Sequence, residues 1–166
     1  MISRQQLIDS LVKECNVSKH LFSRIPTDAY DFRPTEKQRS TLELLRYLAY
    51  CGSAPIHVML NGSDWKTQWK PYTESVARMR PEEFPAAMDR QAEEMTRMIN
   101  SIPDEDFTTK EVKHPTGEVM TLGLGLVRMP LSWLTAYRQQ LFLYAKQSGA
   151  HELGTSNNWH GRDRQV

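Results

Sequence analysis

The stretch Leu131–Ala145, LSWLTAYRQQLFLYA, decides the fold because it presents one apolar face along a C-terminal helix. At helical spacing, Leu134, Tyr137, Leu141 and Tyr144 share this face. An apolar stripe on a helix has to pack against other elements with apolar stripes. The sequence must therefore supply further helices of the same kind.

Three other segments do so. Ser3 with Gln6, and Ser40 with Glu43, match the capping-box pattern and predict that helices begin at both serines. A third helix is predicted between the prolines that bound residues 81–103. Its apolar stripe consists of Phe84, Met88, Gln91, Met95, Met98 and Ile102.

Several residues interrupt these segments. Gly52 and Pro55 lie inside the second helical run and predict a kink or break there. A short helix is predicted over residues 73–79. The turn sequence over residues 114–117, HPTG, predicts a small β-hairpin. The last helix is expected from about residue 121 to 148, and Gly123, Gly125 and Pro130 weaken its first half, which predicts either a late start or a kink.

This pattern predicts an all-α protein, an up-down-up-down four-helix bundle with a small β-hairpin before the last helix. A chain of 166 residues is expected to form a single domain over residues 1–166. The core is predicted to cover about 3–149. The tail over residues 150–166 has no regular period and is predicted to be irregular, with Trp159 docked on the bundle.

Composition excludes several function classes. The 21 basic and 20 acidic residues give a formal charge of +1, which provides no field to attract nucleic acid or an anionic membrane. The N-terminal residues MISRQQLIDS lack the apolar core of a signal peptide. Cys15 and Cys51 are too few for a disulfide framework. We therefore expect a cytoplasmic protein that binds neither nucleic acid nor a membrane.

Two local motifs resemble a known family. They are STLELLRYLA over residues 40–49 and WLTAYRQQL over residues 133–141. Together with the predicted bundle, they resemble the DinB/YfiT-like superfamily of metal-dependent enzymes from the first helix to about Gly149. That family typically has a histidine in the first motif and H-x-x-x-H-R-G-Q-L in the second. The resemblance implies a divalent metal bound by three histidines, thiol-transfer or isomerase activity, and homodimers formed through helix faces.

The three metal-ligand positions of the family fall on Tyr47, Trp133 and Tyr137. An indole has no lone pair to offer a metal. A neutral phenol, with a pKa near ~10, is a poor ligand for divalent cations at neutral pH. We therefore predict no metal site and no cofactor. Three other positions of the second motif are matched, namely Arg138, Gln140 and Leu141.

No two of the five histidines stand three or four residues apart, so none forms a pair on one helix face. His57 follows Tyr50 by seven residues and shares its face. It either points into the bundle or, as we favour, lies hydrogen-bonded near a helix end.

The three large side chains at the ligand positions allow two interpretations. Either their polar tips orient a small ligand against aromatic faces, or the rings fill the space; their bulk favours the second. The candidate ligand-binding residues are Tyr47, Tyr50, His57, Trp133, Tyr137 and Gln140.

Two functions follow from this reading. The first is a DinB-like protein without the metal site that binds a small molecule or a protein partner. The alternative is a transferase related to the family's metal-dependent thiol S-transferases, with an altered site around Tyr47, His57 and Tyr137.

Overall fold

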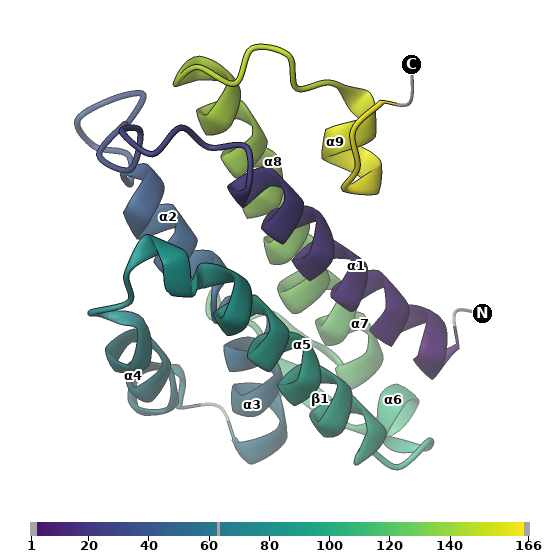
Figure 1. The fold of residues 1–166 in the computed structure, drawn as a ribbon. Coiled ribbons are helices and arrows are strands. Elements are labelled where there is room, and N and C mark those ends of the chain that lie inside the picture. Colours follow the sequence, from purple (N-terminus) through teal and green to yellow (C-terminus); the bar gives the residue numbers. More distant parts are fainter. Residues whose placement is uncertain (1–2, 63, 165–166) are drawn as a thin grey trace.

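The computed structural model describes residues 3–62 and 64–164 and shows a helical bundle with a two-stranded hairpin at one end (Figure 1). The long segments are α1 (Arg4–Phe22), α2 (Thr41–Leu48) followed by α3 (Ser53–Asn61), α5 (Phe84–Asn100), and α7 (Leu122–Leu126) followed by α8 (Ser132–Gln147). The smaller elements are α4 (Trp65–Val76), a 3-10 turn (Pro81–Glu83), α6 (Asp106–Thr109), β1 (Glu111–Lys113), β2 (Val119–Thr121) and α9 (Thr155–His160).

Both predicted capping boxes are formed. The Ser3 hydroxyl accepts the Gln6 backbone N–H at 3.1 Å, and the Gln6 side chain accepts the Ser3 N–H at 2.8 Å. Ser40 and Glu43 make the same reciprocal pair at 3.2 and 2.6 Å. Because each box satisfies backbone donors that the first helical turn leaves free, these residues fix where α1 and α2 begin.

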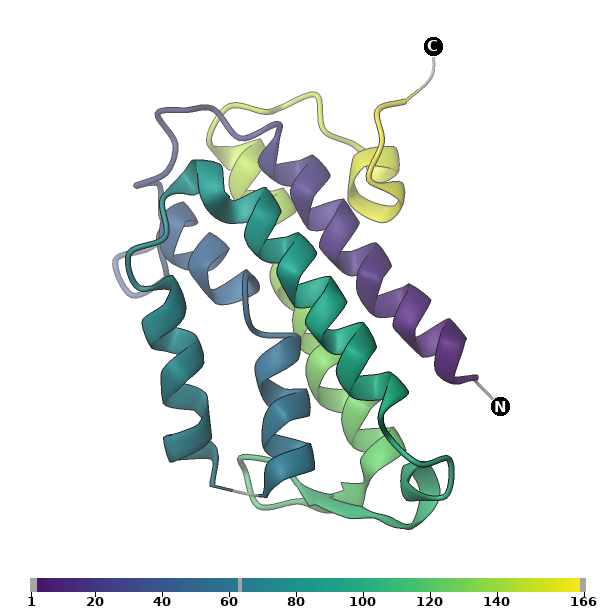
Figure 2. The same cartoon turned by 60° about the horizontal axis from the view of Figure 1, so that its bottom comes forward.

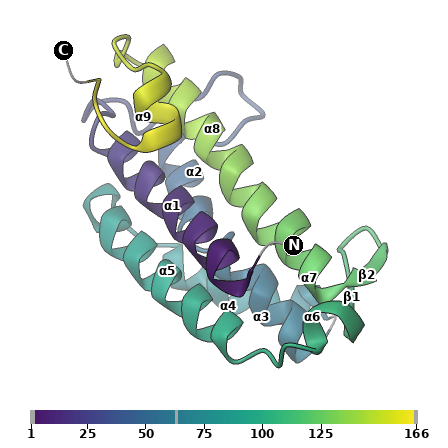
Figure 3. The same cartoon turned by 90° about the vertical axis from the view of Figure 1, so that its right-hand side faces the viewer.

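The core lies between α1, α5 and α8, with α2 and α3 closing it (Figure 3). Fully buried side chains at these contacts include Leu11, Leu21, Leu44, Met88, Leu134 and Leu141. The predicted all-α class and the hairpin are confirmed: β1 and β2 pair antiparallel, with Val112 opposite Met120. Within the described ranges, no helix combines the length and apolarity that crossing a membrane requires.

The direction of the helices differs from the expectation in one detail. The chain passes along α2 and α3, returns along α4, and then runs along α5 in the same direction as α3 (Figure 2). The four long segments therefore run up, down, down and up, and directions alternate only when α4 is counted. The extra helix arises because the Trp65–Val76 segment forms a full α-helix beside α3.

The predicted break between α2 and α3 is real, and a side chain from another helix completes it. The buried Gln91 of α5 accepts the backbone N–H of Gly52 at 2.8 Å and donates to the carbonyl of Leu48 at 2.9 Å. Its oxygen also accepts the N–H of Ser53 at 3.3 Å. A Cβ atom on Gly52 would stand 2.7 Å from the side chains of Leu134 and Met95, so a larger residue here would force both to shift.

The last helix is irregular where its sequence contains residues that disfavour a regular α-helix. A π-turn over Val127–Leu131 contains Pro130, whose missing N–H cannot support the regular ladder. The carbonyl of Val127 accepts both the backbone N–H of Ser132, in the spacing of a π-turn, and the Ser132 hydroxyl at 2.8 Å. The π-turn lies in the half of the helix that the sequence predicts to be weakened, and it separates α7 from α8.

Two expectations are corrected. The helix expected over residues 73–79 is α4, which begins earlier because Asp64 caps it by accepting the Thr67 N–H at 3.1 Å. The tail contains α9, which packs beside α1. Asn157 and Asn158 are buried in the docked tail, and Trp159, although 52% exposed, contacts the bundle through the Arg138 guanidinium, 5.2 Å from its ring.

We expect Gln91→Leu to lower the free energy of unfolding by about 3 kcal/mol, since buried backbone groups left without partners cost roughly 1–3 kcal/mol each. Urea denaturation followed by circular dichroism measures the change. Glu93→Ala, an exposed position two residues along the same helix, is the control and should stay within about 0.5 kcal/mol of wild type. Equal stability of the Gln91→Leu variant and the control would contradict the bridging role.

A candidate aromatic ligand site

Helix α4 carries one aromatic face that is only half covered. Trp65, Trp69 and Thr73 follow each other at intervals of four residues and therefore lie on the same side of the helix. All twelve residues of α4 lie within the described ranges, and none of them is buried. The helix thus rests on the bundle through partly exposed rings.

These rings meet a third tryptophan from the last helix. Trp133 of α8 lies 6.2 Å from Trp65 and 5.9 Å from Trp69 between ring centroids, and Trp65 and Trp69 are 5.9 Å apart. The separations fall in the range in which aromatic side chains attract one another. A hydrogen bond from the indole N–H of Trp65 to the carbonyl of Lys113, at 3.0 Å, ties α4 to the hairpin.

Three tyrosines, Tyr47, Tyr50 and Tyr137, continue the cluster towards the interior. The rings of Tyr47 and Tyr137 are 4.5 Å apart and inclined by 61°, and Tyr50 bridges from Tyr47 at 5.3 Å to Trp69 at 5.5 Å. The Arg39 guanidinium lies over the Tyr47 ring at 4.3 Å. Burial, with the neighbouring Cys51 and tyrosine hydroxyls, raises the pKa of Tyr47 well above its usual value, so this phenol is neutral.

A groove of about 630 Å³ opens on the outer side of these rings. Its lining combines aromatic faces with the stems of two lysines, namely Tyr47, Trp65, Lys66, Trp69, Lys70, Thr73, Pro115 and Trp133. The two interpretations, a ligand pocket and a space filled by rings, therefore apply to different parts of the aromatic cluster. Ring contact fills the space between Tyr47 and Tyr137, whereas the side facing α4 is open.

The other two candidates lie elsewhere. His57 packs against Tyr72, with ring centroids 5.7 Å apart, and its Nδ1 is 3.3 Å from the amide nitrogen of Asn61. Gln140 donates to the Tyr144 hydroxyl at 2.7 Å. Among the described residues that line the groove, neither appears. The structure thus brings together Tyr47, Tyr50, Trp133 and Tyr137 but leaves His57 and Gln140 apart.

Sequence reasoning missed the contribution of α4. In this segment the sequence pattern predicts a helix only over residues 73–79, and no element is assigned to Trp65 and Trp69. Their spacing of four residues, after the capping residue Asp64, was the pattern that could have revealed a helix with one aromatic face.

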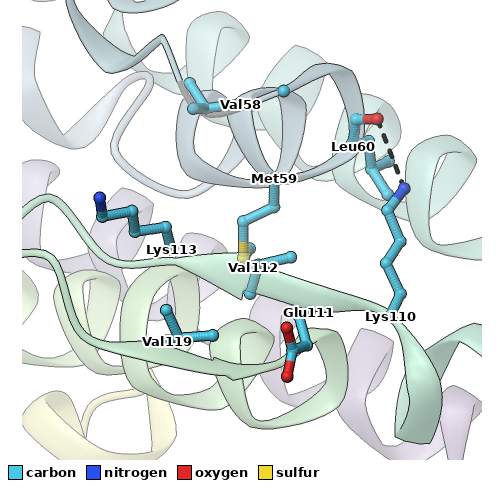
Figure 4. A pocket seen from close by; sticks show the side chains of 9 residues that line it. Val58, Met59, Leu60, Lys110, Glu111, Val112, Lys113 and Val119 are labelled. Atoms are coloured by element: carbon cyan, nitrogen blue, oxygen red, sulfur yellow. Dashed lines mark hydrogen bonds between the residues drawn. The ribbon is translucent and has the colours of Figure 1, made fainter.

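A second hollow, of about 500 Å³, lies between α3 and the hairpin (Figure 4). Met59 points towards Val112 of β1 across its floor. Lys110 donates to the carbonyl of Leu60 at 3.5 Å, a favourable place for a cation near the C-terminal end of a helix. The described lining residues include no aromatic ring, and the contacts are those of a seam between a helix and a hairpin.

The fold is a bundle of four long helical segments, and the groove lies between α4 and the second and last of these segments. The family model of the DinB superfamily matches residues 11–129, and the chain belongs to that superfamily. The crystal structure of the DinB-like protein YjoA from Bacillus subtilis is similar, with a TM-score of 0.66 and 19% identity over 90% of this chain and 96% of that one. No match is found among curated proteins.

Tyr47, Trp133 and Tyr137, which the resemblance places at the family's ligand positions, do not fit a divalent metal. Tyr47 keeps its proton and Trp133 offers no lone pair, while the Arg39 cation lies 4.3 Å from the Tyr47 ring and 5.6 Å from that of Tyr137. A divalent cation there would be repelled by the guanidinium. Across residues 3–62 and 64–164, no group of three or more histidine, cysteine or acidic side chains is placed to hold a metal ion.

We expect the alkaline stability of the protein to depend on Tyr47. Its pKa is raised in the folded state, so the unfolded chain loses the proton first, near pH ~10. The contribution of the Tyr47 hydroxyl to the free energy of unfolding is complete below this pH and is lost as the pH rises towards the folded-state pKa. Tyr47→Phe should therefore lose less stability than wild type when urea denaturation is repeated above pH ~10. Parallel pH profiles of the two proteins would show that the Tyr47 hydroxyl titrates normally.

Proposed function

We propose that this member of the DinB superfamily binds a planar, largely apolar small molecule in the groove between α2, α4 and α8, without a metal at the family's ligand positions. The observation that carries the proposal is the convergence of Trp65, Trp69 and Trp133 on one open groove. Tryptophan rings left partly exposed on a helix provide large apolar area with little conformational freedom to lose on binding.

The size of the groove suits a small ligand. Its volume of about 630 Å³ lies within the range of ~300–1,000 Å³ typical of ligand sites. A planar ring inserted beside the tryptophans can gain about 0.5–1.5 kcal/mol for each aromatic contact beyond the area it buries. The aliphatic stems of Lys66 and Lys70 extend the apolar wall while their charged ends stay in water.

The transferase alternative finds less support in the contacts. Its three residues would have to act together, yet His57 contacts Tyr72 and Asn61, whereas Tyr47 and Tyr137 contact each other. The Cys51 thiol is buried, and burial raises its pKa well above the usual value, which keeps the thiol protonated and unreactive. A homodimer and a cytoplasmic location remain predictions.

The neutral dye N-phenyl-1-naphthylamine is a suitable probe, because it is planar, apolar and fluorescent only out of water. We expect saturable binding to the wild-type protein and about tenfold weaker binding to Trp69→Ala, which removes one wall of the groove. Trp69→Phe should recover part of the affinity, since it restores an aromatic face. Dye fluorescence against protein concentration gives the dissociation constants.

Trp159→Ala is the matched control. It also removes a half-exposed tryptophan, but from α9, which lies beside α1 and away from α4 (Figure 1). Its affinity for the dye should equal that of wild type. An equal loss in both tryptophan variants, or no saturable binding by the wild type, would refute the proposed site.

A further inference from the structure

A smaller hollow of about 210 Å³ adjoins the aromatic groove. Tyr47 and Thr73 line both, so the two spaces are neighbours that share these side chains as a wall. The smaller hollow differs from the groove in its chemistry, because Arg39 and Arg46 reach into it. We refer to it as the arginine lobe.

The arginines of this lobe have unused hydrogen-bond donors. Arg39 stacks on Tyr47 and Tyr137, and among the described residues its guanidinium has no ion-pair or hydrogen-bond partner, although its charge is one of the causes that lower the pKa of nearby Glu43. Arg46 donates its Nε–H to the carbonyl of Met79 at 3.0 Å, which leaves its terminal nitrogens without a partner among the described residues. Both side chains are thus held in place while their donors stay available.

The carboxylate in the lobe is already engaged. Glu43 accepts the backbone N–H of Ser40 at 2.6 Å and pairs with Arg33 at 3.3 Å. The hydrogen bond from the Ser40 backbone lowers the pKa of Glu43, so it is ionised, but its charge is shared with a residue outside the lobe. Glu43 therefore leaves hydrogen-bond donors of Arg39 and Arg46 available to a ligand.

We infer that the ligand is an amphipathic anion, with its planar apolar body between the tryptophans and a sulfonate, carboxylate or phosphate group bound by Arg39 and Arg46. This inference rests on the proposed function. A guanidinium presents paired donors that match oxyanions, and stacking on the tyrosine rings orients the fork of Arg39 before the ligand arrives. The arginine lobe, with about 210 Å³, is large enough for such a group, and its two guanidinium groups suit an oxyanion better than an apolar ring.

The lysines of the groove are weaker candidates for this task. Lys70 already pairs with Glu74 at 3.6 Å, and the side chain of Lys66 is exposed on the outer side of α4. A flexible, fully hydrated ammonium also contributes less to a directed contact than a stacked guanidinium. The anion is therefore assigned to the arginine lobe.

The test compares two dyes that share their aromatic body. The probe 8-anilino-1-naphthalenesulfonate differs from N-phenyl-1-naphthylamine only by its sulfonate. We expect the sulfonate dye to bind the wild-type protein about tenfold more tightly than the neutral dye. This advantage should disappear in Arg39→Gln and shrink in Arg46→Gln, and it should persist in the control Arg90→Gln, at an exposed position of α5 that lines neither hollow. Lys66→Gln tests the competing lysine of the groove. Near-UV circular dichroism confirms that each variant is folded.

The neutral dye distinguishes the possible failures. Unchanged binding of the neutral dye to Arg39→Gln shows that the aromatic groove is intact, and Arg39→Lys should keep part of the preference because it keeps the charge. Equal affinity of the wild type for both dyes would overturn the inference while leaving the proposed function in place. Loss of the preference in Lys66→Gln alone would also overturn it. Failure of both dyes to bind would instead refute the proposed function itself.

Discussion

The side-chain amide of Gln91 is the contact on which the rest of the structure depends. It joins the carbonyl of Leu48 at the end of α2 to the N–H groups at the start of α3. Without such a partner, a break in the middle of a buried segment would leave backbone groups unsatisfied in a dry core. Because the amide both donates and accepts, one residue of α5 permits the segment to bend inside the bundle.

The bend has consequences for the site. With the second segment divided, α4 can run back beside both of its parts, as Figure 2 shows. Its tryptophans then reach Tyr50 of α2 and Trp133 of α8. In a straight helix over residues 41–61, different side chains would face the tryptophans of α4. The aromatic groove is therefore a product of the break and of the amide that satisfies it.

Sequence reasoning succeeded where local chemistry decides the structure and failed where distant partners do. The capping boxes at Ser3 and Ser40 and the π-turn around Pro130 involve neighbours within a few residues, so their patterns are legible. The role of Gln91 was hidden because a polar residue in an apolar stripe does not reveal what it will bond. The same holds for Asn157 and Asn158, which dock α9 although their segment has no apolar period. The placement of Tyr47 and Tyr137 in contact followed from the family resemblance, but the groove required α4, which no motif indicated.

The second family motif separates into residues with different physical tasks. Buried Arg138 pairs with Glu14 of α1 at 2.8 Å and reaches Asn158 of α9, so it holds three helices together. Gln140 supports Tyr144, whose hydroxyl donates to the carbonyl of Arg39 at 3.1 Å. These contacts need no metal, and they fix the backbone from which Arg39 extends over the two tyrosines. The resemblance implies a metal cation close to Tyr47 and Tyr137, whereas the structure has the Arg39 guanidinium over the Tyr47 ring at 4.3 Å. An arginine held in this way puts a positive charge beside the groove, and this charge is the physical basis for proposing an anionic ligand.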